Sequence, residues 1–167
     1  MTEIQKKTIW EKEGILVGEL SFNQDDKIKK KKFVELKRRV ILVVPIDEDS
    51  VYLLKEYRPL LERTVWRVPA GTLDVNEDPK KGAERELLEE TGFLAKKLNL
   101  LSKYDYMGWV KFPIFLFKAE GLNKKEQQLE FYEEINLVKV TREEAKRIAL
   151  NEMVEPHHAF AVLKCIE

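Results

Sequence analysis

The sequence has little cysteine, no long apolar run and no excess of either charge. Its single cysteine, Cys165, cannot form a disulfide within the chain. The first ten residues lack the apolar core of a signal peptide. The longest apolar run, residues 40–46, has the length of a strand and is too short to cross a bilayer. We therefore expect a cytoplasmic protein without a membrane partner.

The charged residues balance each other. Lysine plus arginine number 30, aspartate plus glutamate also number 30, and the formal net charge is zero. Without a general basic field the chain is not expected to bind nucleic acid, so an anionic ligand must be bound by a local group of side chains. The four lysines at 29–32 are typical of a charged edge strand, and we assign them no function.

Strand-like and helix-like segments follow one another in irregular order. The 167 residues, 44% of them hydrophobic, suit one compact domain with at most a small appendage. Apolar and β-rich patterns predict strands at 14–22, 39–46, 50–57, 94–104, 112–119 and 135–140. Asp78-Pro79 predicts the beginning of a helix at 79–91, which Gly92 can end. Thr141 with Glu144 predicts a helix at 141–150, and Pro156 predicts one at 156–166. This mixture predicts an α+β fold.

The first predicted helix carries three carboxylates on one face. Glu86, Glu89 and Glu90 are three and four residues apart, and such like charges repel each other. A solvated acidic helix that pairs with Arg85 and nearby lysines would be the ordinary explanation. Gly71 and Glu77 in the entry loop and Gly92 at the helix end stand at fixed spacing from these acids, which a solvated helix does not require. They favour a metal site instead. Clustered carboxylates are the ligands that Mg²⁺ or Mn²⁺ prefers.

Residues 71–93 resemble a complete Nudix box, G-x5-E-x7-R-E-U-x-E-E-x-G-U, where U is apolar. The resemblance implies an α/β/α sandwich with a mixed sheet between helices. It also implies that Glu86, Glu89 and Glu90 bind a divalent metal, that Arg85 orients these acids, and that Glu77 supports the loop.

Further segments resemble the ADP-ribose pyrophosphatase branch of that family; they are residues 56–59, 68–71 and 115–122. The resemblance implies that the Ala70 carbonyl and Glu133 join the metal site and that Arg58 contacts the diphosphate. It also implies that an N-terminal β extension, residues 1–36, forms a homodimer and that residues 37–167 form the Nudix hydrolase domain.

The sequence departs from this branch at two positions. Met107 stands where the branch has a proline, and Arg67 stands where it usually has a glutamate. Another nucleoside diphosphate sugar therefore stays open as the substrate. The residues expected to bind it are Arg58, Arg67, Gly71, Met107 and Trp109.

The expected reaction is hydrolysis of the diphosphate with Mg²⁺, or Mn²⁺, as the cofactor. The metal would neutralise the phosphate oxygens and place the attacking water, and a carboxylate would remove its proton. Glu133 or Glu130 is the expected general base, Glu89 is the alternative, and Glu90 belongs to the same catalytic group. ADP-ribose would give AMP and ribose 5-phosphate.

Other interpretations stay open. A dinucleoside polyphosphate, NADH or a damaged nucleoside triphosphate would be a different substrate, and a non-catalytic nucleotide-binding module would be a different class of protein.

Four aromatic residues either stack on a base or pack in the core: Trp66, Tyr104, Tyr106 and Trp109. We expect His157 and His158 to lie on the surface and Cys165 to be a buried apolar group.

Overall fold

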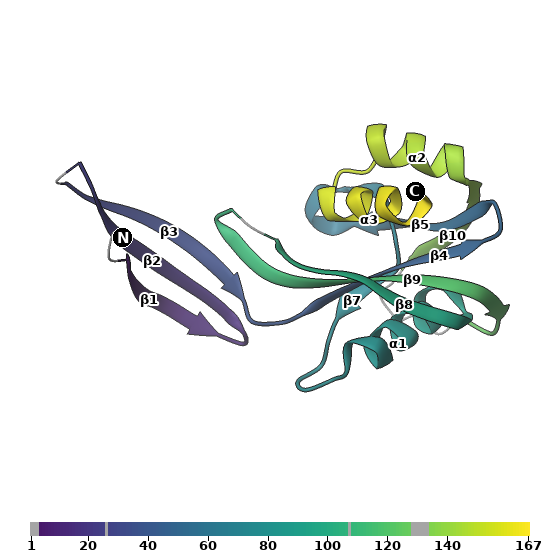
Figure 1. Ribbon diagram of the computed structural model, residues 1–167, viewed down its shortest axis with the longest axis horizontal. Coiled ribbons are helices and arrows are strands. Elements are labelled where there is room, and N and C mark those ends of the chain that lie inside the picture. The colour runs from purple at the N-terminus through teal and green to yellow at the C-terminus, as the bar shows by residue number, and fades with distance from the viewer. Residues whose placement is uncertain (1–3, 26, 107, 128–133) are drawn as a thin grey trace. The chain divides into compact units, whose positions relative to one another are not determined.

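The computed structural model describes residues 4–25, 27–106, 108–127 and 134–167 (Figure 1). They form two compact units, each described by itself below. The first comprises Met1–Arg39 and Tyr104–Ile114, and the second comprises Val40–Lys103 and Phe115–Glu167. Among the described residues no helix is long and apolar enough to span a membrane.

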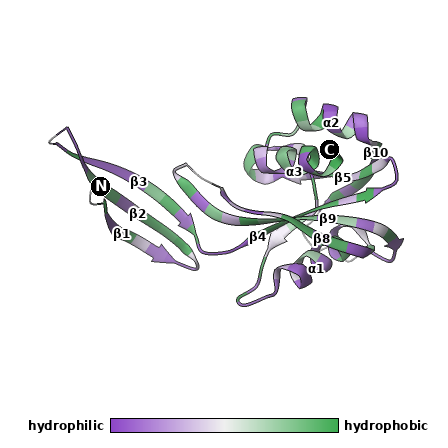
Figure 2. Cartoon of the chain, in the orientation of Figure 1, coloured by the Kyte–Doolittle hydropathy of each residue, from purple (hydrophilic) through white to green (hydrophobic). Residues whose placement is uncertain are grey.

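The first unit is built from strands. β1 (Ile4–Lys12), β2 (Ile15–Gln24) and β3 (Lys27–Leu36) pair in antiparallel order, and the predicted strand 14–22 lies within β2 apart from its first residue. The end of β3 pairs in parallel with the beginning of β9 (Val110–Lys124) at Val34 and Glu35. The lysines of β3 are exposed, and much of this strand is hydrophilic (Figure 2).

The second unit contains a mixed sheet. β4 (Val40–Asp47) and β5 (Ser50–Arg58) form the predicted hairpin, and β10 (Ile135–Thr141) pairs with β5. β9 lies on the other side of β4, and β8 (Phe93–Tyr106) pairs with β9. β6 (Arg63–Arg67) and β7 (Ala70–Thr72) were not predicted; they pair with β5 and β4. Both are too short to show a clear alternation, and a 3-10 turn, η1 (Pro59–Leu61), separates β5 from β6.

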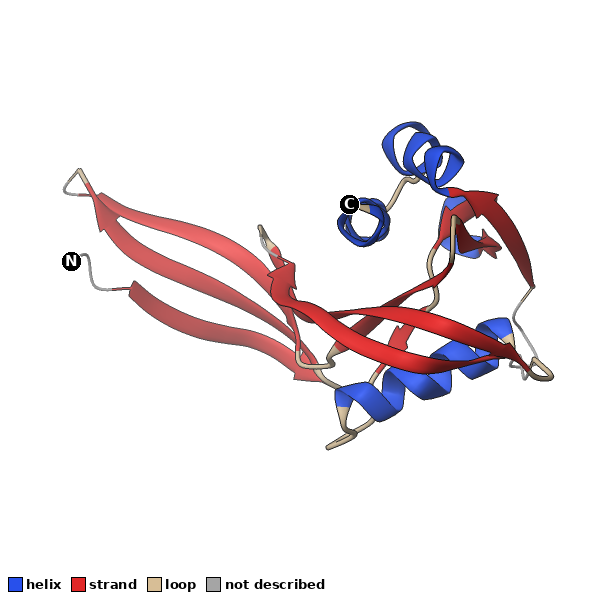
Figure 3. Cartoon of the chain, turned by 45° about the vertical axis from the view of Figure 1, so that its right-hand side comes forward, coloured by secondary structure: helices blue, strands red, loops and turns tan. Residues whose placement is uncertain are grey.

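The three predicted helices are confirmed. They are α1 (Pro79–Thr91), α2 (Arg142–Asn151) and α3 (Pro156–Ile166). The Asp78 side chain accepts hydrogen bonds from the first turn of α1, and the Thr141 hydroxyl accepts one from the first turn of α2. Within the second unit, α1 packs on β4 and β7, whereas α2 and α3 cover the opposite face of the sheet (Figures 1 and 3).

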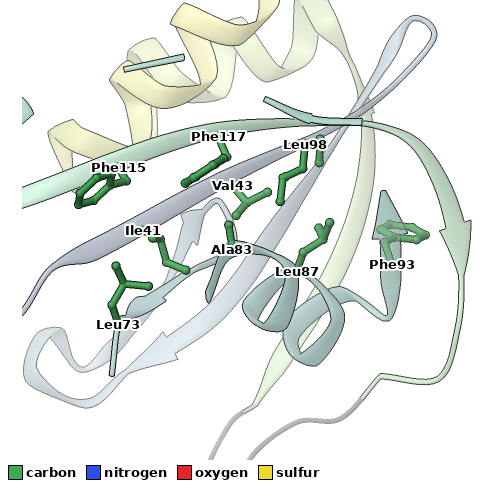
Figure 4. Packing of buried hydrophobic residues seen from close by; sticks show 10 residues of the cluster. Ile41, Val43, Leu73, Ala83, Leu87, Phe93, Leu98, Phe115 and Phe117 are labelled. Atoms are coloured by element: carbon green, nitrogen blue, oxygen red, sulfur yellow. The ribbon is translucent and has the colours of Figure 1, made fainter. Parts of the chain in front are cut away.

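The core between α1 and the sheet fixes the orientation of the helix. Ala83 and Leu87 of α1 are buried against Ile41 and Val43 of β4, and aromatic residues of β9 complete this cluster (Figure 4). Full burial of one such large apolar side chain stabilises a fold by about 1.5–3 kcal/mol. The apolar face of α1 is therefore held on the sheet, which sets the direction of its acidic side chains.

Candidate active site

The loop before α1 is closed by its own hydrogen bonds. The Glu77 carboxylate accepts one from the Asp74 N–H at 2.9 Å, and the Glu77 N–H donates to the Asp74 carbonyl at 3.1 Å. Asp78 then caps the helix, and Pro79 stands in the first turn, where an N–H would have no helical partner. The loop therefore leads into the helix in one defined conformation.

Gly92 ends α1 in a conformation that favours glycine. Its φ is 69°, in the left-handed region, and its N–H donates to the Leu88 carbonyl. A Cβ at this position would lie 2.7 Å from the Lys125 carbonyl oxygen. Both the turn and the close approach of the 125–127 backbone thus require a residue without a side chain.

Arg85 connects the loop with the acidic face of α1. Its Nε lies 3.1 Å from Glu77 Oε1, and its Nη1 lies 2.7 Å from Glu86 Oε1 and 3.0 Å from Glu89 Oε2. The hydrogen bond with Glu77 is the largest of the contacts that raise the pKa of Arg85 above its ordinary value. The guanidinium therefore stays charged and holds two of the three acids in place.

Glu90, the third acid, is buried beside β7. Its side chain is 3% exposed, compared with 32% for Glu89. Glu90 Oε2 accepts a hydrogen bond from the Ala70 N–H at 2.9 Å, and Glu90 Oε1 lies 3.4 Å from Arg67 Nη2. Arg67 Nη2 also donates to the Ala70 carbonyl at 2.8 Å. The Ala70 peptide and the Glu90 carboxylate are thus held together.

Gly71 lets another carboxylate approach the same strand. A Cβ on Gly71 would lie 1.9 Å from Glu86 Oε1, so the carboxylate of Glu86 fills the space that any other residue would occupy. The carboxylates of Glu86 and Glu90 therefore both lie against the backbone of β7. Glu89, one turn after Glu86, is linked to Glu86 through Arg85.

Arg58 belongs to the same network of charges. Its Nη1 lies 3.1 Å from Glu56 Oε1, and its Nη2 lies 3.7 Å from Glu155 Oε1. The second oxygen of Glu56 accepts a hydrogen bond from Arg67 Nη1. Arg58 is partly exposed, so its guanidinium is accessible to an anion, whereas Arg67 is buried.

Not all residues named from the sequence have a described place in this network. Glu130, Glu133 and Met107 lie outside the described residues. Trp109 belongs to the first unit, where it is exposed and Lys31 Nζ lies 4.6 Å from the centre of its ring. The indole N–H of Trp66, in the second unit, donates to Glu152 at 2.8 Å.

The expectation that His158 lies on the surface was wrong. Its ring is buried, and Nδ1 accepts a hydrogen bond from the Val68 N–H at 3.2 Å. Burial, assisted by the charge of Arg67, lowers the pKa of His158 well below 6.5. The buried face of α3 comprises His158, Ala161, Val162 and Cys165, at helical spacing. That spacing was the signal that could have placed His158 inside, and it also confirms the buried Cys165.

Among the described residues, Glu155, His157 and His158 form a group whose potential ligand atoms lie within 4.8 Å of one another. The contact with Val68 argues against His158 as a ligand, because a neutral ring that accepts at Nδ1 carries its proton on Nε2. That nitrogen faces Glu155 Oε2 at 3.7 Å. We therefore interpret this group as polar support for Arg58, whose Nη2 faces the other Glu155 oxygen.

The donors around β7 fit a hard divalent cation. At β7 these donors are the carboxylates of Glu86 and Glu90 and the carbonyl of Ala70, and Glu89 is joined to Glu86 through Arg85; all of them offer oxygen ligands. Because Gly71 has no side chain, the carboxylate of Glu86 can lie directly against the strand. This arrangement can gather cations, and Glu56 and Arg67 link it to Arg58, whose guanidinium is partly exposed.

Comparison with known proteins agrees with this geometry. The sequence model of the NUDIX domain family matches residues 36–160 of this chain. The chain is 32% identical to an ADP-ribose pyrophosphatase of Bacillus subtilis (strain 168), over 97% of this chain and 93% of that protein. It is 34% identical to a methanol dehydrogenase activator of Bacillus methanolicus, over 70% of this chain and 64% of the relative.

A solved structure, the crystal structure of an ADP compounds hydrolase, has the same fold with a TM-score of 0.81 and 20% identity. The match covers 98% of this chain and 91% of that one. The chain belongs to the Nudix hydrolase family. Hydrolases of this family generally use a divalent metal ion, which the oxygen donors around β7 suit.

Proposed function

We propose that this protein hydrolyses the diphosphate of ADP-ribose, with Mg²⁺ as its cofactor, to AMP and ribose 5-phosphate. The observation that supports the reaction is the gathering of Glu86, Glu90 and the Ala70 peptide around β7. The observation that supports the substrate is the similarity to the Bacillus subtilis ADP-ribose pyrophosphatase along nearly the whole of both chains.

In this proposal Glu86, Glu89, Glu90 and the Ala70 carbonyl hold the metal, and Mn²⁺ can replace Mg²⁺. The bound cation would neutralise phosphate oxygens and lower the pKa of the attacking water. Arg58, which is partly exposed and fixed by Glu56, contacts the diphosphate. Gly71, beside which the carboxylate of Glu86 lies, belongs to the proposed binding residues together with Met107 and Trp109.

A carboxylate removes the proton of the attacking water. Glu89 is the candidate within the described residues, because it is the most exposed of the three acids and accepts a hydrogen bond from Arg85. In the segment before β10 we also propose Glu130 and Glu133 as candidate bases, and Glu133 as a further metal ligand.

We further propose that residues 1–36 form a homodimer extension of a catalytic domain that comprises residues 37–167. β1 exposes large apolar side chains, Ile4, Ile9 and Trp10 among them, as a strand does whose partner belongs to another subunit. Light scattering on the full chain measures the oligomeric state directly; a monomeric mass at micromolar concentration would contradict this part of the proposal.

A substrate panel with matched variants tests the activity. Release of AMP is measured for ADP-ribose, a UDP-sugar, NADH, a dinucleoside polyphosphate and an oxidised nucleoside triphosphate, each with Mg²⁺. We expect ADP-ribose to have the highest kcat/KM. Glu90→Gln keeps an acceptor for the Ala70 N–H but removes the charge, so its kcat should fall at least about 100-fold. Glu84→Gln, exposed on the same helix, is the control and should keep wild-type turnover.

Three results would contradict the proposal. Preference for another compound of the panel would remove the assignment of ADP-ribose and retain the reaction class. Equal turnover of wild type and Glu90→Gln would show that Glu90 is not catalytic, and no turnover by either protein would leave a nucleotide-binding module.

A further inference from the structure

Arg67 differs from the other cations of the candidate site in its burial. It stands at the end of β6, opposite Leu54 of β5, and its side chain is 6% exposed. Three acceptors surround its guanidinium: a carboxylate oxygen of Glu56, the Ala70 carbonyl at 2.8 Å and Glu90 Oε1 at 3.4 Å. An arginine so buried, including its Nε, is not exposed to a substrate, although the sequence suggested that Arg67 binds one.

The charge of Arg67 is retained in this environment. Its guanidinium lies against the carboxylates of Glu56 and Glu90, whose opposite charges compensate its burial. A buried charge with these partners is stable only while they keep their positions. Arg67, Glu56 and Glu90 therefore fix one another.

The contacts of Arg67 lead to two of the proposed metal ligands. The Ala70 carbonyl has two lone pairs, so it can accept from Arg67 and still face a cation. The Ala70 N–H in turn donates to Glu90. On the other side of Arg67, the Glu56 carboxylate accepts hydrogen bonds from both Arg67 and Arg58. Arg58 is the residue proposed to contact the diphosphate. One continuous chain of charged contacts thus joins Arg58 to Glu90.

We propose that Arg67 is a positioning residue that holds the Ala70 carbonyl and Glu90 ready for the metal, with Glu56 as its counter-ion, and that it does not contact the substrate. This inference rests on the proposed function for the identity of the metal ligands. The planar fork of an arginine can reach three acceptors in fixed directions, whereas a lysine ammonium is a compact charge without that geometry.

Binding of Mn²⁺ alone, without nucleotide, tests the proposal. Free Mn²⁺ is measured by electron paramagnetic resonance during titration of wild type, Arg67→Lys and Arg63→Lys. Arg67→Lys keeps the charge and loses the fork, so we expect its Kd for Mn²⁺ to rise about 10-fold. Arg63 is exposed at the other end of β6, and its variant should bind Mn²⁺ like the wild type. The KM of Arg67→Lys for ADP-ribose at saturating metal should change less than about 2-fold.

Two other results of these titrations and KM measurements would overturn the proposal. A raised KM with wild-type affinity for Mn²⁺ would make Arg67 a substrate contact. Wild-type values of both would mean that charge alone matters or that Arg67 has no role. Should Arg67→Lys fail to fold, Glu56→Gln decides: it keeps an acceptor for Arg67 but removes the counter-charge. Its Kd for Mn²⁺ should then rise at least about 3-fold, and an unchanged Kd overturns the proposal.

The outcome for the proposed function is separate. A wild-type protein that binds Mn²⁺ but leaves ADP-ribose intact contradicts the substrate assignment only, and the comparison of Mn²⁺ affinities still decides the role of Arg67. A wild-type protein that binds no Mn²⁺ overturns both.

Discussion

The substitution Gly71→Ala should remove activity without unfolding the protein. The added Cβ would lie 1.9 Å from Glu86 Oε1 and 2.1 Å from Glu86 Cδ, where ordinary contact begins at 3.4 Å. The carboxylate must therefore move by about 1.5 Å, whereas ligand distances in a metal site vary by only about 0.2 Å. Since a misplacement of about 1 Å can cost about 100-fold in rate, we expect kcat/KM for ADP-ribose to fall at least about 100-fold.

Stability should change little in this variant. Gly71 lies outside the left-handed region, so alanine is compatible with its backbone. A compatible replacement of glycine by alanine stabilises a protein by about 0.4–1 kcal/mol through the unfolded chain, and this gain offsets part of the cost of moving one side chain. We therefore expect the free energy of unfolding in urea to stay within about 1 kcal/mol of the wild-type value.

Gly82→Ala in α1 is the matched control. Its Cβ would lie 2.2 Å from Leu73 Cδ2 in the apolar core and 3.2 Å from the carboxylate of Glu77, which is not one of the proposed metal ligands. Overpacking costs about 1–3 kcal/mol, and alanine recovers up to about 1 kcal/mol in a helix, so this variant should lose stability and keep its affinity for Mn²⁺. Wild-type turnover of Gly71→Ala, or a loss of both activity and stability in this variant, would contradict the proposed role of the space beside Gly71.

Two further predictions concern the last helix. Burial lowers the pKa of His158, so between its folded pKa and 6.5 the unfolded chain binds more protons; the free energy of unfolding should drop by up to about 1.4 kcal/mol per pH unit below 6.5. Urea unfolding between pH 7 and 5 measures this slope. It should flatten in His158→Asn, and an equal slope in both proteins would assign it to other groups. Burial raises the pKa of the Cys165 thiol to about 12, so a disulfide reagent should label it only after unfolding; rapid labelling of the native protein would contradict this.

The helices could be predicted from the sequence because their signals are local. Asp78 and Gly92 mark the two ends of α1, and Thr141 with Glu144 marks the beginning of α2. Each of these residues contacts backbone within a few positions, so no knowledge of the tertiary structure was needed. The placement of three acids on one side of α1 follows from the same helical period.

The depth of each acid depends on tertiary structure. Whether Glu90 or Glu89 is buried is decided by β7, a strand of three residues that no sequence pattern predicted. The burial of Arg67 likewise depends on the register of β6 against β5, which brings Glu56 within reach of the guanidinium. A change of register by one residue would turn Arg67 to the other face, and nothing local specifies that register.

The central claim is that the acids of α1 and the backbone of β7 bind divalent cations that hold a diphosphate. Anomalous diffraction from crystals soaked with Mn²⁺ and a nonhydrolysable ADP-ribose analogue tests it directly. We expect an anomalous peak within about 2.5 Å of oxygens of Glu86, Glu90 and Ala70, with diphosphate oxygens beside it. A peak only at Glu155 and His157, or no peak near α1 with the analogue bound, would show that these acids do not bind the cation.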